Sequence, residues 1–116
     1  MDPTDLLRPA DVGLALPLPA ELERLVVLNL INLEPWHVMP RDEARTRFDG
    51  LRSRYQRTYF PFARRGDNDD IACLDPSQPG AVTVVHDFAS AGSEARTIHE
   101  TFWDWFRAAI EDMIEF

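Results

Sequence analysis

The chain has 116 residues, of which 45% are hydrophobic and 28% are charged, and its formal net charge is −8. A length near that of one domain and this share of apolar residues support a single core, which excludes a disordered tail and a two-domain enzyme. The acidic balance disfavours nonspecific binding to nucleic acid or anionic membranes. No apolar run approaches the roughly 20 residues that cross a bilayer and no basic leader opens the chain, so we expect one soluble, cytoplasmic domain over residues 1–116.

The charge is unevenly distributed along the chain. All twelve basic residues are arginine, and residues 41–65 carry eight of them against three acids, whereas residues 66–116 carry two against eleven. Such segregation is typical either of ion pairing within the fold or of a partner surface marked by charge. Both interpretations remain open from the sequence.

The first third of the chain predicts an extended lead-in followed by an apolar element. Residues 1–19 contain four prolines, which favour a short turn of helix and an extended stretch. From residue 20 the chain is apolar on nearly all sides; Pro19 and the glutamates after it favour a helix start, and Pro35 must end the element. Periodicity alone does not separate a buried helix from a buried strand over residues 20–33.

Residues 41–56 predict an amphipathic helix. Four apolar residues share one helical face, namely Ala44, Phe48, Leu51 and Tyr55. The arginines of this segment lie off those positions, so we place them on the solvated side. Gly50 costs about 1 kcal/mol relative to alanine inside a helix, which predicts a bend or a break there.

Three short strand signals follow. Residues 58–63 are aromatic and rich in β-forming types, although Pro61 confines them to an edge or a bulge. Residues 71–74 form an apolar run after the polar turn 66–70, and residues 81–88 alternate between two faces. The short connections between these segments predict an antiparallel meander.

The C-terminal segment predicts an amphipathic helix. Thr97 and Glu100 have the spacing of a capping box at its start. Its apolar side comprises Ile98, Phe102, Trp105, Phe106, Ala109, Ile110, Met113, Ile114 and Phe116. So much aromatic surface must pack on a sheet or a helix. The predicted fold class is therefore α+β, a small antiparallel meander with helices packed on one face.

The acidic turn with Asp67, Asp69 and Asp70 is the first candidate for chemistry. Its oxygen ligands resemble the start of a calcium loop, but the glycine and the glutamate that such a loop needs at positions six and twelve are absent. Two interpretations remain. The turn is a hairpin in which Asx side chains bond the backbone, or the three aspartates and His86 hold a metal for hydrolysis.

Other catalytic motifs are absent from the sequence. Cys73 lies in an apolar strand signal, which keeps a thiol protonated and unreactive, and a single cysteine excludes an internal disulfide. No Gly-x-Ser-x-Gly elbow surrounds a serine, and the five glycines are scattered singly. Arginines beside Tyr59 and Phe62 resemble a single-strand-binding pattern, but the net charge argues against nucleic acid. We therefore expect a protein-binding domain that is not an enzyme and has no cofactor.

Four segments of the sequence resemble bacterial proteins of the SUKH superfamily, the cell-wall-assembly-regulator-like immunity proteins. The first two are Asn-Leu-Ile-Asn-Leu-Glu-Pro-Trp-His at 29–37 and Pro-Phe-Ala-Arg-Arg-Gly-Asp-Asn-Asp-Asp-Ile-Ala-Cys at 61–73. Val-Val-His-Asp-Phe at 84–88 and Phe-Trp-Asp-Trp-Phe at 102–106 match the same pattern of strand, loop and closing helix. Together these segments span most of residues 29–116.

The resemblance implies an α+β domain that binds a toxin from a contact-dependent or polymorphic toxin system. Such a protein blocks its toxin sterically, without chemistry of its own. The resemblance implies scaffold roles for Pro61, Phe62, Gly66, Asp67, Asp69 and Asp70. Some relatives are regulators or scaffolds, so a non-catalytic regulatory scaffold remains an alternative, as does the metal-dependent hydrolase.

We place the expected partner surface on the turn 66–70 and on the acidic loop and helix after it. An acidic surface suits a basic toxin such as a nuclease domain, because complementary charge speeds association and sets the register of binding. Tryptophan is a common anchor at interfaces. The predicted binding residues are therefore Asp67, Asp69, Asp70 and Trp36, in a chain expected to be a monomer or a weak dimer.

Overall fold

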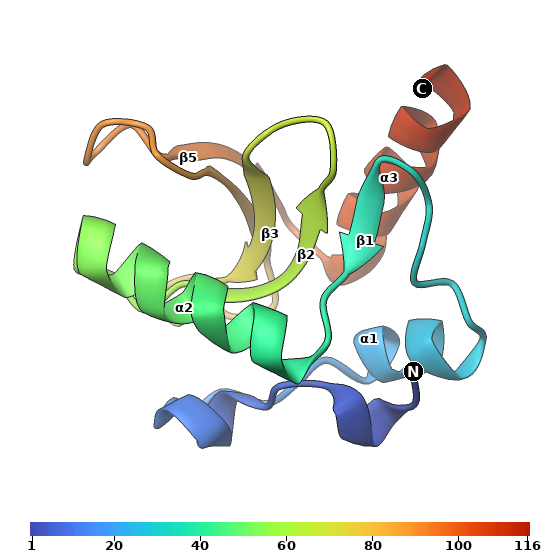
Figure 1. Cartoon of the computed structure of the whole chain (residues 1–116), viewed down its shortest axis with the longest axis horizontal. Coiled ribbons are helices and arrows are strands. Elements are labelled where there is room, and N and C mark those ends of the chain that lie inside the picture. The colour runs from blue at the N-terminus through green and yellow to red at the C-terminus, as the bar shows by residue number, and fades with distance from the viewer.

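The computed structural model describes residues 1–116 and contains one five-stranded antiparallel sheet and three α-helices (Figure 1). The strands are β1 (Trp36–Val38), β2 (Phe60–Arg65), β3 (Asp70–Leu74), β4 (Val82–His86) and β5 (Ala95–His99). The helices are α1 (Ala20–Val27), α2 (Arg41–Tyr55) and α3 (Phe102–Glu115), preceded by two 3₁₀ turns, η1 (Pro3–Asp5) and η2 (Pro9–Val12). None of these helices has the length and apolar composition that crossing a membrane requires.

The predicted α+β class, the meander and the C-terminal amphipathic helix are confirmed. The strand order is β1-β2-β3-β4-β5, and each strand pairs with the next one along the chain. The three strands predicted from the sequence are β2, β3 and β4. The two edge strands were not predicted, because β1 has only three residues and β5 is exposed along its length without an apolar face.

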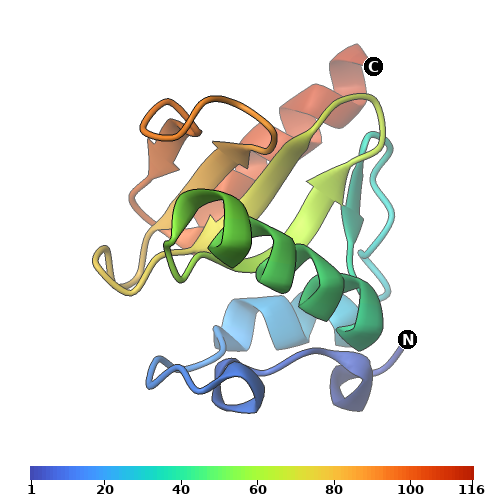
Figure 2. The ribbon, with the colours of Figure 1, turned by 60° about the vertical axis from the view of Figure 1, so that its left-hand side comes forward.

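The placement of the helices differs from the prediction, because they cover both faces of the sheet. Figure 2 shows the sheet between α2 and α3. Arg64 and Arg65 are neighbours on β2 that point to opposite faces: Arg64 pairs with Glu43 of α2, whereas Arg65 pairs with Asp112 of α3. The physical reason is that residues 71–74 of β3 are all buried, and a strand that is apolar on both sides needs cover on both sides.

An aromatic cluster holds α3 against the sheet. The ring of Phe62, at a bulge in β2, has its centroid 5.3 Å from that of Phe102 and 5.0 Å from that of Trp105. Trp36 of β1 packs edge-to-face on Trp105 at 5.5 Å. Such pairs contribute about 0.5–1.5 kcal/mol each beyond the burial of their surface. The cluster therefore determines where the two ends of α3 lie.

The capping box predicted at Thr97 and Glu100 is wrong. Thr97 lies in β5, paired with β4, and α3 is capped instead by Thr101, whose hydroxyl oxygen accepts a hydrogen bond from the backbone N–H of Asp104 at 3.1 Å. Both threonines precede an acidic residue by three positions, so the sequence spacing fits either one. The pairing of β5 with β4 decides between them.

Replacing Thr101 by alanine should lower the free energy of unfolding by about 1 kcal/mol, because one N–H at the start of α3 loses its acceptor. Thr97→Ala is the matched control, since this residue is exposed on an edge strand, and its effect should stay within about 0.5 kcal/mol. Urea unfolding followed by circular dichroism compares the two variants with the parent chain. Equal losses at both positions would contradict the observed helix start.

Residues 20–33, whose structure the sequence left open, are a short helix followed by a loop. α1 ends at Val27, and Asn29 has a left-handed φ of 58°, which turns the chain out of the helix. The loop then runs back towards β1, where the carbonyl of Ile31 accepts a hydrogen bond from the N–H of Val38 at 2.9 Å.

α2 has the predicted apolar face, but it does not bend at its glycine. Its buried residues are Ala44, Phe48, Leu51 and Tyr55. The helix continues through Gly50, where an added Cβ would lie 2.8 Å from the Nη2 atom of Arg54. The missing side chain thus leaves room for the Arg54 guanidinium.

Two arginines of α2 reach a buried carboxylate, although the sequence placed them on the solvated side of the helix. Arg54 donates a hydrogen bond from Nε to Oδ1 of Asp87 at 2.7 Å, and Nη1 of Arg47 lies 3.5 Å from Oδ2. The Asp87 side chain is fully buried, and a buried carboxylate requires such cations nearby. These contacts attach the loop after β4 to α2 and use part of the arginine excess inside the fold.

Asp87→Asn should lower the free energy of unfolding by about 2–3 kcal/mol, because two arginines lose their counter-charge. The loss should stay below the roughly 3–5 kcal/mol of a fully buried pair, since both arginines are about one-third exposed. Asp49→Asn, on the exposed side of α2, is the control and should change stability by less than about 0.5 kcal/mol. Urea unfolding at neutral pH measures the free energy of unfolding of both variants. If Asp87→Asn lowers it no more than Asp49→Asn does, the ion pairs of Asp87 do not stabilise the fold.

Candidate protein-binding surface

The predicted acidic turn and the C-terminal end of α3 lie side by side at one end of the molecule (Figure 2). Between them is a shallow depression lined by Arg65, Asp67, Asp112, Glu115 and Phe116. We call this end of the molecule the acidic tip. It consists of Asp67, Asp69, Glu111, Asp112, Met113, Ile114, Glu115 and Phe116.

The turn between β2 and β3 is held by its own side chains. Oδ1 of Asn68 accepts a hydrogen bond from the backbone N–H of Asp70 at 2.8 Å, and Asp67 accepts two from Arg65, at 2.8 and 2.9 Å. The predicted hairpin turn with Asx bonding is therefore confirmed. The side chain of Asp69 is exposed and has no partner within the chain.

Arg65 joins the turn to α3. Besides its two bonds to Asp67, its Nη1 atom lies 3.2 Å from Oδ2 of Asp112, and its guanidinium carbon lies 5.9 Å from the centre of the Trp36 ring. The hydrogen bonds with Asp67 raise the pKa of Arg65 and lower the pKa of Asp67 below its ordinary value. One guanidinium thus sets the position of the turn relative to the helix end.

The charges in the last turns of α3 are unfavourable for the helix itself. Glu111, Asp112 and Glu115 lie at the negative end of the helix dipole, and the last turn has no basic residue. A charge of the wrong sign at a helix end typically costs about 0.3–1 kcal/mol. Only Asp112 has a cation of this chain beside it. A basic group from another molecule would relieve the repulsion at the two glutamates.

Apolar side chains are exposed beside these carboxylates. Met113, Ile114 and Phe116 are 39%, 68% and 65% exposed. The sequence predicted that the whole apolar side of the helix packs, but only its first half does, because α3 extends past the edge of the sheet (Figure 1). Exposed apolar side chains that are surrounded by polar residues are typical of protein-binding surfaces.

Trp36 does not belong to the exposed surface for which the sequence proposed it. The residue is only 4% exposed, and its indole N–H donates a hydrogen bond to Oδ2 of Asp112 at 2.9 Å. A buried ring cannot anchor a partner, so this part of the predicted site is corrected. Trp36 instead stabilises the acidic tip from the interior, because its indole N–H fixes the position of the Asp112 carboxylate.

The four residues considered as metal ligands do not converge. Asp70 and His86 face each other across β3 and β4, with 2.7 Å between Oδ1 and Nδ1. Asp67 instead binds Arg65, and Asp69 points to solvent without a partner. No three His, Cys, Asp or Glu side chains of the chain are grouped so that they could hold a metal ion.

The contact between Arg65 and Asp112 was not predicted from the sequence. The pair of Arg65 with Asp67 is a local one, since the two residues are only two positions apart in the chain. Asp112 follows Trp105 by seven residues and Ala109 by three, so helical spacing places it on the face of α3 that packs on the sheet, and this spacing is the signal that could have found it. The contact arises only because the aromatic cluster places the end of α3 beside β2.

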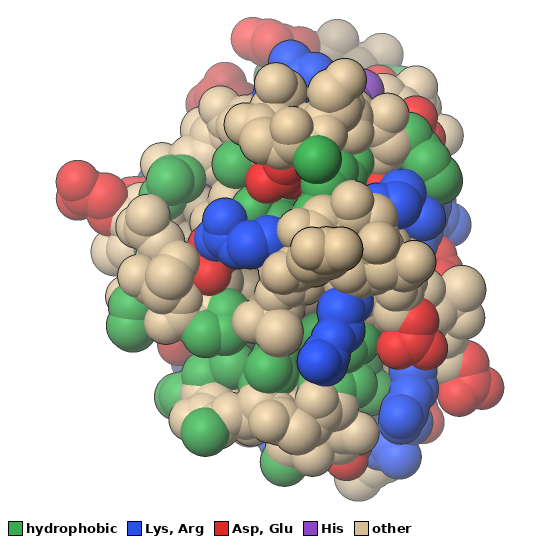
Figure 3. Space-filling model, turned by 90° about the vertical axis from the view of Figure 1, so that its left-hand side faces the viewer, with side chains coloured by type: hydrophobic (Ala, Val, Ile, Leu, Met, Phe, Trp, Pro, Cys, Tyr) green, Lys and Arg blue, Asp and Glu red, His purple; other side chains and the backbone are tan.

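The face at the C-terminal end of α2 has a different character. Figure 3 shows arginine side chains among exposed hydrophobic ones on this face, with acidic side chains mainly towards its edges. The acidic tip and this arginine-bearing face therefore offer different chemistry to a partner.

Comparisons with protein-family models, with curated proteins and with solved structures found no match.

Arg65→Gln should return the pKa of Asp67 towards its ordinary value of 3.8, because the carboxylate loses the hydrogen bonds of the guanidinium and its positive charge. Arg64→Gln is the matched control, since Arg64 pairs with Glu43 on the other face of the sheet and should leave Asp67 unaffected. Carboxyl ¹³C shifts followed from about pH 2 to about pH 6 report the titration. An Asp67 titration unchanged by Arg65→Gln would contradict the geometry of the acidic tip.

Proposed function

We propose that this protein is an immunity-type protein that binds and neutralises a cognate bacterial toxin domain, with the acidic tip as its binding surface. The observation that carries the proposal is that unpaired carboxylates and exposed apolar side chains occupy the same end of the molecule. The carboxylates are those of Asp69, Glu111 and Glu115, and the most exposed apolar residues are Ile114 and Phe116. The resemblance to the SUKH superfamily supports a toxin as the class of partner.

The charge of the acidic tip favours a basic toxin, such as a nuclease domain. A lysine or arginine of the partner at the end of α3 would pair with Glu111 or Glu115 and also neutralise the negative end of the helix dipole. Complementary charges of this kind speed association and suppress wrong partners. The exposed Ile114 and Phe116 would add apolar contact, to which aromatic residues often contribute most.

Neutralisation by this surface needs no chemistry from the immunity protein. A nuclease domain binds its substrate through basic residues, because phosphate contacts dominate the affinity for nucleic acid. An acidic surface bound to those residues occupies the place of the phosphates. The toxin is then inhibited sterically and electrostatically for as long as the complex lasts.

Capture by the tagged protein from a lysate of its host tests the proposal. The captured polypeptide should arrest growth when it is expressed alone, and co-expression of this chain should restore growth. If no captured polypeptide is toxic, or if co-expression gives no protection, the immunity function is wrong.

The double variant Asp69→Asn/Glu115→Gln should weaken the binding of the captured toxin by about tenfold to a hundredfold, and more so at low salt. Both side chains are exposed and unpaired, so the fold should be retained, whereas Asp67 and Asp70 have partners within the chain. Asp49→Asn/Glu100→Gln makes the same charge change away from the acidic tip and is the control. Calorimetry of the purified pair compares them, and equal weakening by both variants would exclude the acidic tip as the specific surface.

A further inference from the structure

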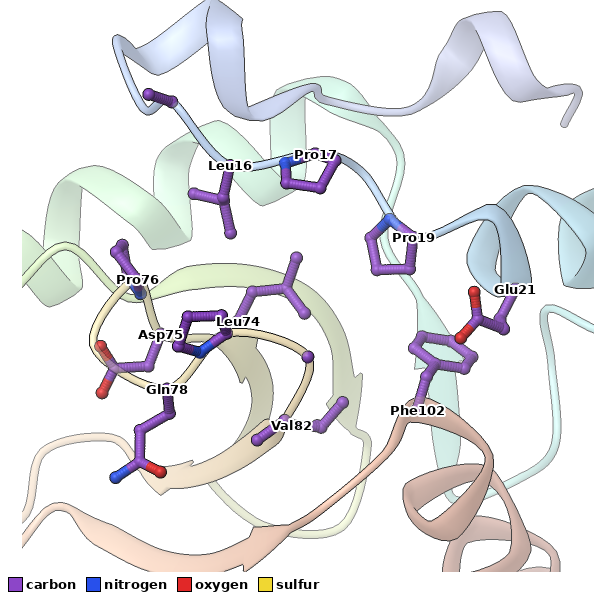
Figure 4. A pocket seen from close by; sticks show the side chains of 14 residues that line it. Leu16, Pro17, Pro19, Glu21, Leu74, Asp75, Pro76, Gln78, Val82 and Phe102 are labelled. Atoms are coloured by element: carbon purple, nitrogen blue, oxygen red, sulfur yellow. The ribbon is translucent and has the colours of Figure 1, made fainter.

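A groove of about 500 Å³ lies at the other end of α3 from the acidic tip (Figure 4). One wall is the extended segment 15–19, and the other is the turn that joins β3 to β4. The base of the groove is apolar and includes Leu74, Val82 and Phe102. Its volume falls within the roughly 300–1,000 Å³ of typical ligand pockets.

Prolines make both walls of the groove rigid. Pro17 and Pro19 lie on one wall and Pro76 and Pro79 on the other. The ring of each proline restricts the backbone dihedral φ to about −65°. A groove with walls of this kind is preformed, so little conformational entropy is lost when it is filled.

The wall formed by residues 15–18 has free backbone hydrogen-bonding groups. Leu16 and Leu18 pack against the core, whereas Ala15 and Pro17 are exposed, which is the alternation of an extended strand. None of the four backbone C=O groups is hydrogen-bonded within the chain, nor is any of the three N–H groups, which belong to Ala15, Leu16 and Leu18 because Pro17 has none. An extended backbone with free donors and acceptors is the structure to which a peptide strand adds.

One carboxylate at the groove is without a cation. Glu21 lies beside Pro19 and Phe102 and has no ion-pair partner (Figure 4). The other carboxylate of the lining, Asp75, pairs with Arg57 at 2.9 Å and accepts a hydrogen bond from the N–H of Ser77. An occupant therefore meets an apolar base and one unpaired negative charge beside it.

We propose that this groove binds an extended peptide segment of a partner protein, in which a large apolar residue stands next to an arginine or lysine. The apolar side chain covers Phe102 and Leu74, the cation pairs with Glu21, and the peptide backbone bonds to residues 15–18. The site is separate from the acidic tip and does not depend on the toxin proposal.

Two capped peptides, acetyl-Ser-Phe-Arg-Ser-amide and acetyl-Ser-Arg-Phe-Ser-amide, test the groove in ¹H–¹⁵N NMR titrations of the full chain. At least one should cause saturable shift changes at the non-proline residues of 15–21 and 78–82 and at residue 102, with a Kd on the order of 0.1–1 mM. Peptides with glutamate in place of arginine should bind at least about tenfold more weakly. No shift changes at the groove up to about 5 mM peptide, or equal binding of the glutamate peptides, would overturn the proposal.

Variants separate this site from the acidic tip. Glu21→Gln should weaken the arginine peptide about threefold to fivefold, as expected for a partly exposed ion pair, and should leave toxin capture unchanged. Ala15→Trp places a large ring at the exposed rim of the groove and should abolish peptide binding. Glu115→Gln, an equal charge change at the acidic tip, should leave peptide affinity unchanged. Shift changes centred on the acidic tip would overturn the groove proposal and leave the toxin proposal standing.

Discussion

The packing of α3 on the sheet is the contact on which the other features of this protein depend. Phe102 and Trp105 pack against Phe62, and Trp105 also packs against Trp36. Because these rings are large and buried, α3 can pack against the sheet at only one position along it. The first turn of α3 then forms part of the base of the groove, and its last turns lie beside the β2–β3 turn. A change in this packing would move both proposed surfaces at once.

Ion pairs within the fold account for much of the arginine excess in residues 41–65. Five arginines there have carboxylate partners in the chain, namely Arg47, Arg54, Arg57, Arg64 and Arg65. The carboxylates left without cations include Asp69, Glu111 and Glu115 at the acidic tip. The two interpretations of the charge segregation are therefore complementary. Internal pairing uses the arginines, and the remaining acids leave one end of the molecule negative.

The acidic tip combines two features that do not help this chain to fold. Acidic residues at the C-terminal end of a helix oppose its dipole, and exposed apolar side chains gain nothing in water. Both features are expected at a binding surface, because a bound partner can supply a cation for the acidic residues and can cover the apolar side chains. Arg65 limits the cost by neutralising Asp67 and Asp112.

The sequence by itself determined α2, the three central strands and the polar turn, because each has a local signal: four apolar residues at helical spacing, short apolar runs, or Asx residues that bond the adjacent backbone. Only the tertiary structure decided that α3 begins after Thr101, that helices cover both faces of the sheet, and that Trp36 is buried. Each of these depends on which distant segment a residue meets. β5 is held by backbone hydrogen bonds to β4 that leave no pattern in its side chains, and Trp36 is enclosed only when α3 packs across it. Local periodicity reports the face of an element that will be buried, but not the partner that buries it.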